Sequence, residues 1–561
     1  MRHQVTHKSE LAIQSSPSEA STSKSGGVLD QKTSASLKSK WPVSEDLYGS
    51  DLPCRVQGEV ADLVVLGDIP PEIDGTFYRV TVDPYVPPHP RNVPLDGDGN
   101  ITALRFEDGK VDLKVRYVET ERLQIERKAG KAMFGLYRNP FSHHPCVKAA
   151  VDSTANTNLV LWAGKFLALK EGGLPYQVDP HTLDTITYDP FQDQGIKSKT
   201  FTAHPKIDPF SDELVVHGYE AKGLASTDIV VYALDKDGKK KDEQWIKSPR
   251  CGPIHDCAIT PNWLILVMWP FEANVERMKK GGHHWAWSYD LPATFIVVPR
   301  RKSTKLPDGW QEGEYRVYHD RNVMLIHTAG AWEADDGNTL FIETTRVHDN
   351  GFPFFPPDDG RMPAADAKAD FVRFKLDLSQ PTGSKLAGEP EVVLDIPAEF
   401  PRLDERFLSK PYDVSWINVM TPAEHRGQVA TGEEHLLGFG GLDGVAMHRY
   451  STGETKIYWT GFDGICQEPI FIPRSDDAPE GDGWVMCMVE RRAANLCEVI
   501  LLDTKDFTKP VAIIKLPFHV KNQVHGNWID QRRLKERRSL VKEGVDVKIS
   551  KRGALETWDI E

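Results

Sequence analysis

Residues 201–223, FTAHPKIDPFSDELVVHGYEAKG, have the composition of two short strands joined by a turn. The Asp, Pro and Ser residues at 208–212 favour a turn, and the extended run 213–219 follows it. His204 is predicted to end the first strand, because Pro205 restricts the residue before it to an extended backbone. A side chain fixed at a strand end beside a rigid turn is well placed to bind a metal ion, so the question is whether His204 has partners.

Runs of this kind recur along most of the chain and predict an all-β fold. Short extended segments, each bounded by Gly, Pro, Asp or Asn, follow one another from residue 62 to residue 516. Helical periodicity is brief, and 271–280 and 531–542 are the best candidates for helices. No break in composition interrupts residues 60–530, and a β-propeller accommodates that length in one body at about 40–50 residues per blade. A sandwich array is the alternative architecture.

The composition excludes several classes of function. The 561 residues carry a formal net charge of −14, whereas a nucleic-acid-binding surface needs concentrated Lys and Arg. The seven cysteines are scattered without CxxC spacing, which argues against a zinc ribbon or a disulfide framework and favours a reducing compartment. No run approaches about 18 apolar residues, and the N-terminus lacks the apolar core of a secretory signal. We therefore expect no transmembrane segment and a cytoplasmic location.

Composition divides the chain into three parts. Residues 1–45 are rich in Ser, Thr, Lys and Gln and are predicted to be a disordered leader. Residues 46–530 are predicted to form a single β-propeller domain. Residues 531–561 form a charged tail that opens with QRRLKERR, a pattern typical of a solvated helix. A basic helix that touches a membrane surface is the alternative for this tail.

Three other histidines have surroundings like those of His204. His255 leads into an apolar strand, His327 closes one, and His525 precedes a glycine. Successive members of the set lie 51, 72 and 198 residues apart, which corresponds to about one blade, one blade with an insertion, and about four blades. Histidines that end inner strands of different blades would converge on the propeller axis. The short spacings of zinc fingers and of HExxH helices are absent, so the pattern matches no familiar zinc class.

Several segments resemble the carotenoid cleavage oxygenase family, in the family's order and over about residues 60–530. The matching segments are GTFYR at 75–79, LDGDGN at 95–100, GYEAKG at 218–223, IHD at 254–256, AEFPRLDER at 398–406, EPIFIP at 468–473 and HGNW at 525–528. The resemblance implies a seven-bladed β-propeller capped by an α-helical and loop dome over the metal centre. It also implies a non-haem Fe(II) cofactor bound by His204, His255, His327 and His525.

The same resemblance implies three glutamates that hydrogen-bond the iron ligands. They match Glu171 in LKEGGLP, Glu399 in the EFP segment and Glu468 in the EPIF segment. An imidazole ligand is oriented when its second ring nitrogen meets a carboxylate. Three carboxylates would also balance the charge of a dication held by neutral ligands.

Two residues favour the branch of the family that cleaves phenolic stilbenes, and the chain looks most similar to the fungal enzymes of that branch. Tyr137, in MFGLYRNP, and Lys170, in LALKE, match its phenol-binding residues. A buried ammonium group is costly in a tunnel built for a hydrocarbon, whereas a phenol oxygen gives it a partner. The predicted activity is a dioxygenase that cleaves the central C=C bond of a 4-hydroxystilbene such as resveratrol with O2, giving two aromatic aldehydes.

Two alternatives remain open from the sequence. The same iron site could cleave a carotenoid or apocarotenoid, since the apolar stretches 285–287 and 351–357 are candidates for a substrate tunnel or for peripheral contact with a membrane. Packing explains these stretches equally well. A non-catalytic propeller that acts as a binding scaffold is the other alternative, and the presence of all four histidines argues against it.

Overall fold

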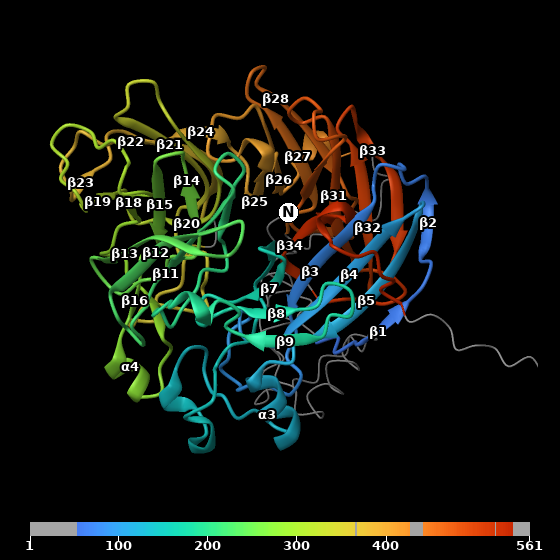
Figure 1. Cartoon of the computed structure of the whole chain (residues 1–561), viewed down its shortest axis with the longest axis horizontal. Helices are drawn as coiled ribbons and strands as arrows, with labels where there is room; N and C mark the ends of the chain where they lie inside the picture. The colour runs from blue at the N-terminus through green and yellow to red at the C-terminus, as the bar shows by residue number, and fades with distance from the viewer. Residues whose placement is uncertain (1–52, 365–366, 427–440, 522, 542–561) are drawn as a thin grey trace, which may run out of the picture.

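The computed structural model describes residues 53–364, 367–426, 441–521 and 523–541. The predicted leader 1–45 and residues 542–561 of the predicted tail lie outside this part of the chain. Seven sheets are arranged around a common centre as the blades of a β-propeller (Figure 1), which confirms the predicted all-β class and the seven-bladed architecture. No helix in the described ranges has the length and apolarity needed to cross a membrane.

The first four blades take their strands largely in chain order, with β34 completing the first. Blade 1 contains β1 Gly58–Val60, β5 Lys110–Tyr117, β4 Gly99–Glu107, β3 Gly75–Val82 and β34 Gln523–Asp530. Blade 2 contains β6 Asn158–Trp162, β7 Lys165–Leu169, β8 Tyr176–Val178 and β9 Thr185–Tyr188. Blade 3 contains β10 Lys206–Asp208, β11 Glu213–Gly218, β12 Asp228–Asp235 and β13 Lys240–Lys247. Blade 4 contains β14 Cys257–Ile259, β15 Trp263–Met268, β18 Thr294–Pro299, β19 Arg316–His319 and β23 Ser384–Lys385.

The remaining three blades follow the same plan, with β2 completing the last. Blade 5 contains β20 Met324–Glu333, β21 Thr339–Val347, β22 Ala369–Asp377 and β24 Glu391–Leu394. Blade 6 contains β25 Ala398–Leu403, β26 Val414–Val419, β27 Gly444–Arg449 and β28 Glu454–Trp459. Blade 7 contains β29 Gly464–Cys466, β30 Ile470–Pro473, β31 Gly483–Arg491, β32 Leu496–Asp503, β33 Asp506–Lys515 and β2 Val64–Gly67.

Packing between blades explains why the strand sequences are apolar on both faces. All six residues of β15, WLILVM, are buried. Trp263, Ile265 and Val267 join the cluster shared with blade 5, whereas the alternate residues Leu264, Leu266 and Met268 join the cluster shared with blade 3. Successive side chains of a strand point to opposite faces, so a blade between two others needs apolar residues at every position.

Two pairings between the ends of the chain close the ring. In blade 1, β34 pairs with β3 so that Trp528 faces Phe77. In blade 7, β2 pairs with β33 so that Leu66 faces Ile513. Because each of these blades combines strands from both ends of the chain, the ring cannot open without breaking a sheet.

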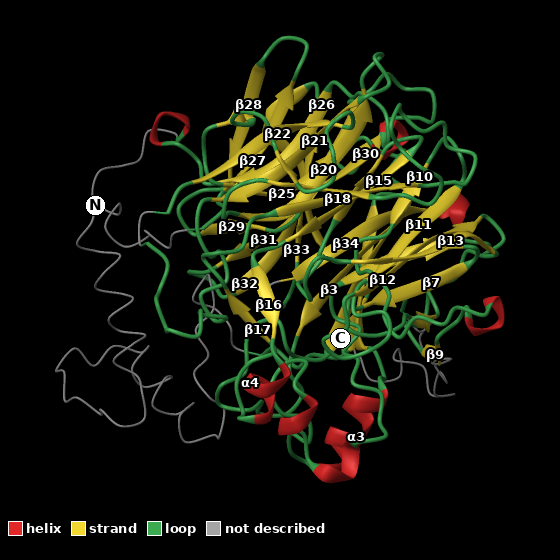
Figure 2. Cartoon of the chain, turned by 90° about the vertical axis from the view of Figure 1, so that its left-hand side faces the viewer, coloured by secondary structure: helices red, strands yellow, loops and turns green. Residues whose placement is uncertain are grey.

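The helices and long connections gather on one side of the propeller, as Figure 2 shows for α3 and α4. α3, Glu121–Ala129, begins after Thr120, whose side chain caps it, and ends at Gly130 in a left-handed conformation. The helix predicted over 271–280 is shorter: α4 covers Val275–Lys279, and the residues before it form strand β16, Phe271–Ala273, which pairs with β17, Trp285–Trp287. The 3-10 turns are Pro140–Ser142, Pro145–Val147, Gln192–Gln194, Glu405–Phe407, Ala423–His425 and Gln531–Arg533.

The described part of the predicted tail, residues 531–541, packs on blades 1 and 2. The helix predicted over 531–542 does not form in its described residues 531–541, where the 3-10 turn Gln531–Arg533 is the only helical element. Leu534 and Leu540 are buried in a cluster with residues of both blades. Lys114 Nζ donates a hydrogen bond of 2.7 Å to the carbonyl oxygen of Leu540, and Arg538 pairs with Asp179 at 3.1 Å. Apolar burial, rather than charge alone, therefore fixes this segment.

A chain that ends at residue 530 is expected to unfold several degrees below one that ends at residue 541. Burying a leucine contributes about 1.5–3 kcal/mol, and the shorter chain loses both Leu534 and Leu540 from the cluster. Thermal unfolding followed by circular dichroism measures the difference. Equal midpoints for the two chains would mean that residues 531–541 contribute nothing to stability.

Candidate metal centre

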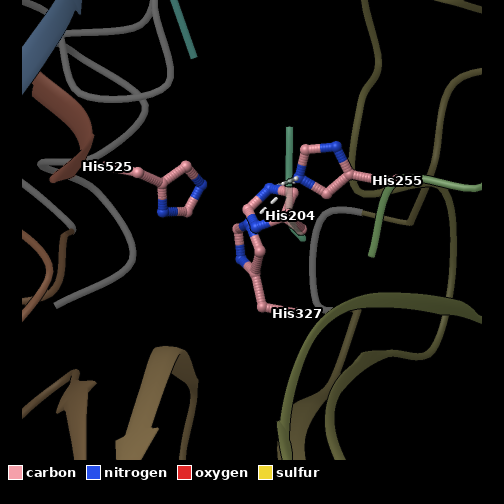
Figure 3. A group of neighbouring side chains, drawn as sticks. All are labelled: His204, His255, His327 and His525. Atoms are coloured by element: carbon pink, nitrogen blue, oxygen red, sulfur yellow. Dashed lines mark hydrogen bonds between the residues drawn. The ribbon is translucent and has the colours of Figure 1, made fainter. Parts of the chain in front are cut away.

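The four predicted histidine ligands meet at the centre of the propeller, with their imidazole rings turned toward one another (Figure 3). His204 Nε2 lies 3.1 Å from His255 Nε2, which lies 3.0 Å from His327 Nε2. One ring nitrogen from each of the four histidines lies within 4.8 Å of the others. These donors lie on or directly before inner strands of blades 3, 4, 5 and 1, so segments from across the propeller define the site.

The prediction that His204 and His327 each end a strand is wrong. His204 and His255 lie in connections just before the innermost strands β10 and β14, and His327 and His525 lie in the first half of β20 and β34. The inner strands therefore begin, rather than end, at the centre. The interval between His327 and His525 spans the rest of blade 5 and blades 6 and 7 before the closing strand of blade 1, about three blades rather than the four expected, because long connections occupy part of it.

The arrangement of donors fits a metal ion. His525 Nε2 is buried and has no hydrogen-bond partner within the described part of the chain, although it points into the group of imidazoles. Burial, reinforced by the neighbouring histidines, lowers the pKa of His204, and burial lowers the pKa of His525 to about 4, so both rings are neutral. Neutral imidazole is the form that binds a metal. The four ring nitrogens are close enough to one another to bind a single cation.

Three glutamates orient three of the four rings, as the resemblance implies. Glu171 pairs with Nδ1 of His255, Glu399 lies 2.5 Å from Nδ1 of His327, and Glu468 lies 3.0 Å from Nδ1 of His525. Each imidazole thereby presents Nε2 to the centre. A carboxylate on the distal ring nitrogen fixes the ring's tautomer and makes it a stronger donor to a metal.

Each glutamate is itself held by further hydrogen bonds. The Tyr219 hydroxyl donates to Glu171 at 2.6 Å, and the Thr345 hydroxyl donates to Glu399 at 2.5 Å. Burial raises the pKa of Glu171, but the charge and hydrogen bond of His255, together with Tyr219, outweigh it and lower the pKa to about 2. This carboxylate is therefore ionised at neutral pH.

Glu468 is held by two arginines and a backbone N–H in addition to its contact with His525. Arg402 Nη1 lies 3.2 Å from its Oε1, Arg79 Nη1 lies 3.4 Å from its Oε2, and the Gly526 backbone N–H donates to it at 3.2 Å. Burial opposes ionisation, yet His525 and the two guanidinium groups hold the pKa of Glu468 well below its usual range. Both arginines are buried or largely buried, so their charges act through little water.

His204 lacks such a glutamate, and sequence reasoning did not identify its neighbour. The nearest carboxylate is that of Asp256, 4.0 Å from His204 Nδ1. Asp256 pairs with Lys206 at 2.8 Å and accepts hydrogen bonds from the backbone and hydroxyl of Thr328. The sequence signal was its position directly after His255, but its contacts with blades 3 and 5 depend on the tertiary structure.

Phe400 is a further residue at the centre that the sequence did not reveal. Its ring stacks on the His327 ring with centroids 5.1 Å apart. Its backbone φ is 56°, an uncommon value for a residue with a side chain. This conformation lets its N–H donate to the preceding Glu399 at 2.5 Å, so the strained residue supports the carboxylate that orients His327.

The structure brings Tyr137 and Lys170 together next to this centre. Both side chains are buried, and Lys170 Nζ lies 4.7 Å from the centre of the Tyr137 ring. The two hydrogen bonds of this ammonium group go to neutral acceptors, the carbonyl of Leu95 at 3.3 Å and the side chain of Asn156 at 3.2 Å. Burial lowers the pKa of Lys170 to about 8, against the opposing effect of nearby carboxylates.

Aromatic rings form a continuous series from the histidines to this tyrosine. Neighbouring ring centroids along the series are 5.0 to 6.0 Å apart. Stretch 351–357 contributes three of the rings, and the aromatic residues of 285–287 are buried in the same cluster. The members, in order from the metal centre, are His255, Trp269, Phe352, Phe354, Phe355 and Tyr137.

Comparison with known proteins identifies the family. The sequence profile of the retinal pigment epithelial membrane protein family matches residues 52–530. The chain belongs to this family. The resemblance to carotenoid cleavage oxygenases seen in the sequence is thereby confirmed, as is the predicted enzyme class, because the related proteins are named oxygenases or dioxygenases.

Three relatives illustrate the range of the family. The chain is 62% identical over 550 residues to resveratrol cleavage oxygenase 1 of Botryotinia fuckeliana, covering 98% of this chain and 97% of that protein. It is 39% identical to carotenoid cleavage oxygenase 1 of Neurospora crassa, covering 87% and 91%. Among solved structures, the lignostilbene dioxygenase of Pseudomonas brassicacearum is 34% identical with a TM-score of 0.79, covering 87% and 99%. The family is metal-dependent, and four histidines of this member form a candidate metal site.

Proposed function

We propose that this protein is a non-haem Fe(II) dioxygenase that cleaves the central C=C bond of 4-hydroxystilbenes such as resveratrol. The observation that carries the proposal is the buried Lys170 beside Tyr137, at the end of an aromatic series that starts at His255. A relative with 62% identity is named a resveratrol cleavage oxygenase, which supports the same substrate class. Two aromatic aldehydes are the expected products.

The proposed ligands of the iron are His204, His255, His327 and His525, with Glu171, Glu399 and Glu468 as the orienting carboxylates. Imidazole suits several transition metals, and the oxygenase names of the relatives favour a redox-active one. Bound Fe(II) would supply the activation of O2. The three carboxylates keep the imidazoles in the tautomer that presents Nε2 and balance the charge of the cation.

In the proposed mechanism, Lys170 and Tyr137 bind the 4'-hydroxyl group of the stilbene. The neutral amine of Lys170 takes the phenol proton at Nζ, and the resulting ammonium group pairs with the phenolate. A lysine with a pKa near 8 has a usable fraction of free amine at neutral pH. The phenolate donates electron density into the conjugated C=C bond, and the buried site strengthens this pairing because little water screens it.

The overall reaction balances without another reductant. The central C=C bond and the O–O bond break, and each alkene carbon receives one oxygen atom as an aldehyde carbonyl. The aromatic side chains of the series exclude water and keep the planar substrate extended between the phenol-binding pair and the metal centre. Trp269, whose ring lies 5.0 Å from that of His255, would lie closest to the reacting bond.

Cleavage of a carotenoid or apocarotenoid is the second candidate, since one relative with 39% identity is named a carotenoid cleavage oxygenase. The aromatic series would also accept a polyene. Lys170 favours the stilbene, because a hydrocarbon offers its buried ammonium group no partner. An apocarotenal from a carotenoid substrate, without aldehydes from stilbenes, would favour this second candidate.

Iron-loaded protein incubated with resveratrol and O2 is expected to release 4-hydroxybenzaldehyde and 3,5-dihydroxybenzaldehyde in equal amounts. Liquid chromatography with mass spectrometry detects both products. Failure to form either aldehyde would rule out the proposed function.

The 4'-methyl ether of resveratrol is the matched control substrate. It has no phenol proton for Lys170 to accept, so its cleavage should be at least roughly 100-fold slower, the usual contribution of general base catalysis. Equal cleavage of the ether and of resveratrol would contradict the role proposed for Lys170 and Tyr137.

A further inference from the structure

Arg138, the residue after Tyr137, lies where four segments of the chain meet. Its guanidinium group donates to the Tyr219 hydroxyl at 2.9 Å and pairs with Glu220. It lies 5.1 Å from the centre of the Tyr219 ring and 5.5 Å from that of Trp285. It also packs beside Gly172, where an added Cβ would lie 3.7 Å from it.

Arg138 and Glu220 form a buried ion pair, and both residues also have an uncommon backbone conformation. The two side chains are 12% and 2% exposed. Their φ angles are 53° and 51°, in the left-handed region that residues with a Cβ rarely occupy. His284, which is fully buried, lies 3.2 Å from the Glu220 carboxylate and 3.0 Å from the backbone carbonyl of Arg138, so it holds both partners. Residues other than glycine with a left-handed backbone tend to cluster at functional sites.

From Arg138 a series of polar contacts leads to the metal centre. Arg138 donates to the Tyr219 hydroxyl, Tyr219 donates to Glu171 at 2.6 Å, and Glu171 pairs with Nδ1 of His255. A cation that donates to the tyrosine hydroxyl makes that hydroxyl a stronger donor to the carboxylate. The position of the His255 ring therefore depends, through two side chains, on Arg138.

The other connection of Arg138 is to the proposed phenol-binding pair. Tyr137 precedes it in the chain, and Lys170 precedes Glu171. Fixing Arg138 against Tyr219 and Gly172 thus fixes the backbone of Tyr137 relative to the segment that carries both Lys170 and Glu171. The positions of the phenol-binding pair and of His255 therefore both depend on Arg138.

We propose that Arg138, held by Glu220, is a positioning residue that sets the distance between the phenol-binding pair Tyr137–Lys170 and the metal-binding His255. The inference deepens the proposed function and rests on it for the identity of the phenol. A planar stilbene has a fixed length between its 4'-hydroxyl and its central bond. A support that sets the same distance in the protein selects substrates by length as well as by the hydroxyl group.

Arg138→Lys and Glu220→Gln test the proposal. Lysine keeps the positive charge but lacks the planar guanidinium group that contacts Tyr219 and Glu220 at the same time. Each change is expected to lower kcat/KM for resveratrol by about 10–100-fold, the range found for outer partners of metal ligands. The second test is made at a metal concentration that saturates every variant. If Arg138 acts by placing Tyr137 against Lys170, the loss caused by Arg138→Lys should then fall to about 3-fold or less in a Lys170→Met background, since coupled sites are not additive.

Competition for cobalt(II) with a chromophoric chelator gives a readout that needs no substrate. Arg138→Lys should bind cobalt about 10-fold more weakly than the native protein, since Glu171 loses support. This result is expected even if stilbenes prove not to be the substrate, so failure of the proposed function and failure of this inference are distinguishable. Unchanged cobalt affinity would overturn the connection to His255.

Arg491→Lys is the matched control, because Arg491 forms a partly buried ion pair with Glu498 in blade 7. It should leave kcat/KM and cobalt affinity unchanged. If Arg138→Lys fails to fold, Glu220→Gln, which keeps the shape of the carboxylate, carries the same test. Native kcat/KM in Glu220→Gln, or an equal loss with and without Lys170, would overturn the proposal.

Discussion

Replacement of His255 by alanine is expected to abolish metal binding and oxygenase activity. His255 Nε2 is 3.1 Å from His204 Nε2 and 3.0 Å from His327 Nε2, so it joins the donors of three neighbouring blades. Its loss also leaves Glu171 buried without the imidazole that stabilises its charge. The loss of activity should exceed the roughly 10–100-fold effect of removing an outer partner of a ligand. Metal content by mass spectrometry and turnover of resveratrol measure the two effects.

His448→Ala is the matched control for this experiment. His448 is also buried, but it contacts Thr455 in blade 6 and takes no part in the metal centre. Its replacement should leave metal content unchanged. A native protein that purifies without iron, together with a His255→Ala protein that keeps its biological role, would instead support the alternative of a non-catalytic scaffold.

The sequence predicted the fold well because its strand and turn signals are local. The turn at 208–212 does separate β10 from β11, and the all-β class needed only the recurrence of such units. Closure of the ring was not predictable in the same way. The pairing of Trp528 with Phe77 joins residues that are far apart in the chain, and no local pattern specifies it.

The helix α3 escaped prediction for a physical reason. Helical periodicity is recognised by an apolar face, but two of the buried positions of α3 are Arg122 and Glu126. Arg122 pairs with Asp96 at 2.9 Å, so an ion pair stabilises the inner face instead of apolar packing. The capping signals Thr120 and Gly130 were present and could have located the helix.

The residues of the candidate site that lie in family motifs were predictable from the sequence. The four histidines, the three glutamates, Tyr137 and Lys170 were all identified by resemblance, and the structure brings them together. Their supports were not identified, because Tyr219, Thr345 and Arg402 resemble ordinary strand residues in sequence. Such contacts depend on blade packing, and a single sequence does not encode them locally.

Lys170→Met is expected to lower kcat/KM for resveratrol by about 10²–10³-fold while leaving metal content unchanged, because it removes the proposed base. Lys170 lies next to Glu171 in the chain but makes none of the contacts that orient His255. The variant should also cleave resveratrol and its 4'-methyl ether at similar rates. Loss of metal from the variant would show that its effect is structural.

Thermal stability should change little in Lys170→Met. Lowering the pKa of Lys170 from 10.5 to about 8 corresponds to a cost on the order of 3 kcal/mol for burying its charge at neutral pH. Methionine relieves this cost but removes two hydrogen bonds, each worth about 1–1.5 kcal/mol. The two effects nearly offset each other, so activity and stability should separate.

The pH dependence of the native enzyme gives the sharpest test of the role of Lys170. Burial lowers the pKa of Lys170 to about 8; below that pH the amine already carries a proton and cannot accept one from the phenol. The value of kcat/KM for resveratrol should therefore rise as the pH increases through about 8. Lys170→Met should lack this rise, whereas ionisation of the substrate itself affects both proteins at higher pH. A native profile that falls through pH 8 would mean that the ammonium form, not the free amine, meets the substrate.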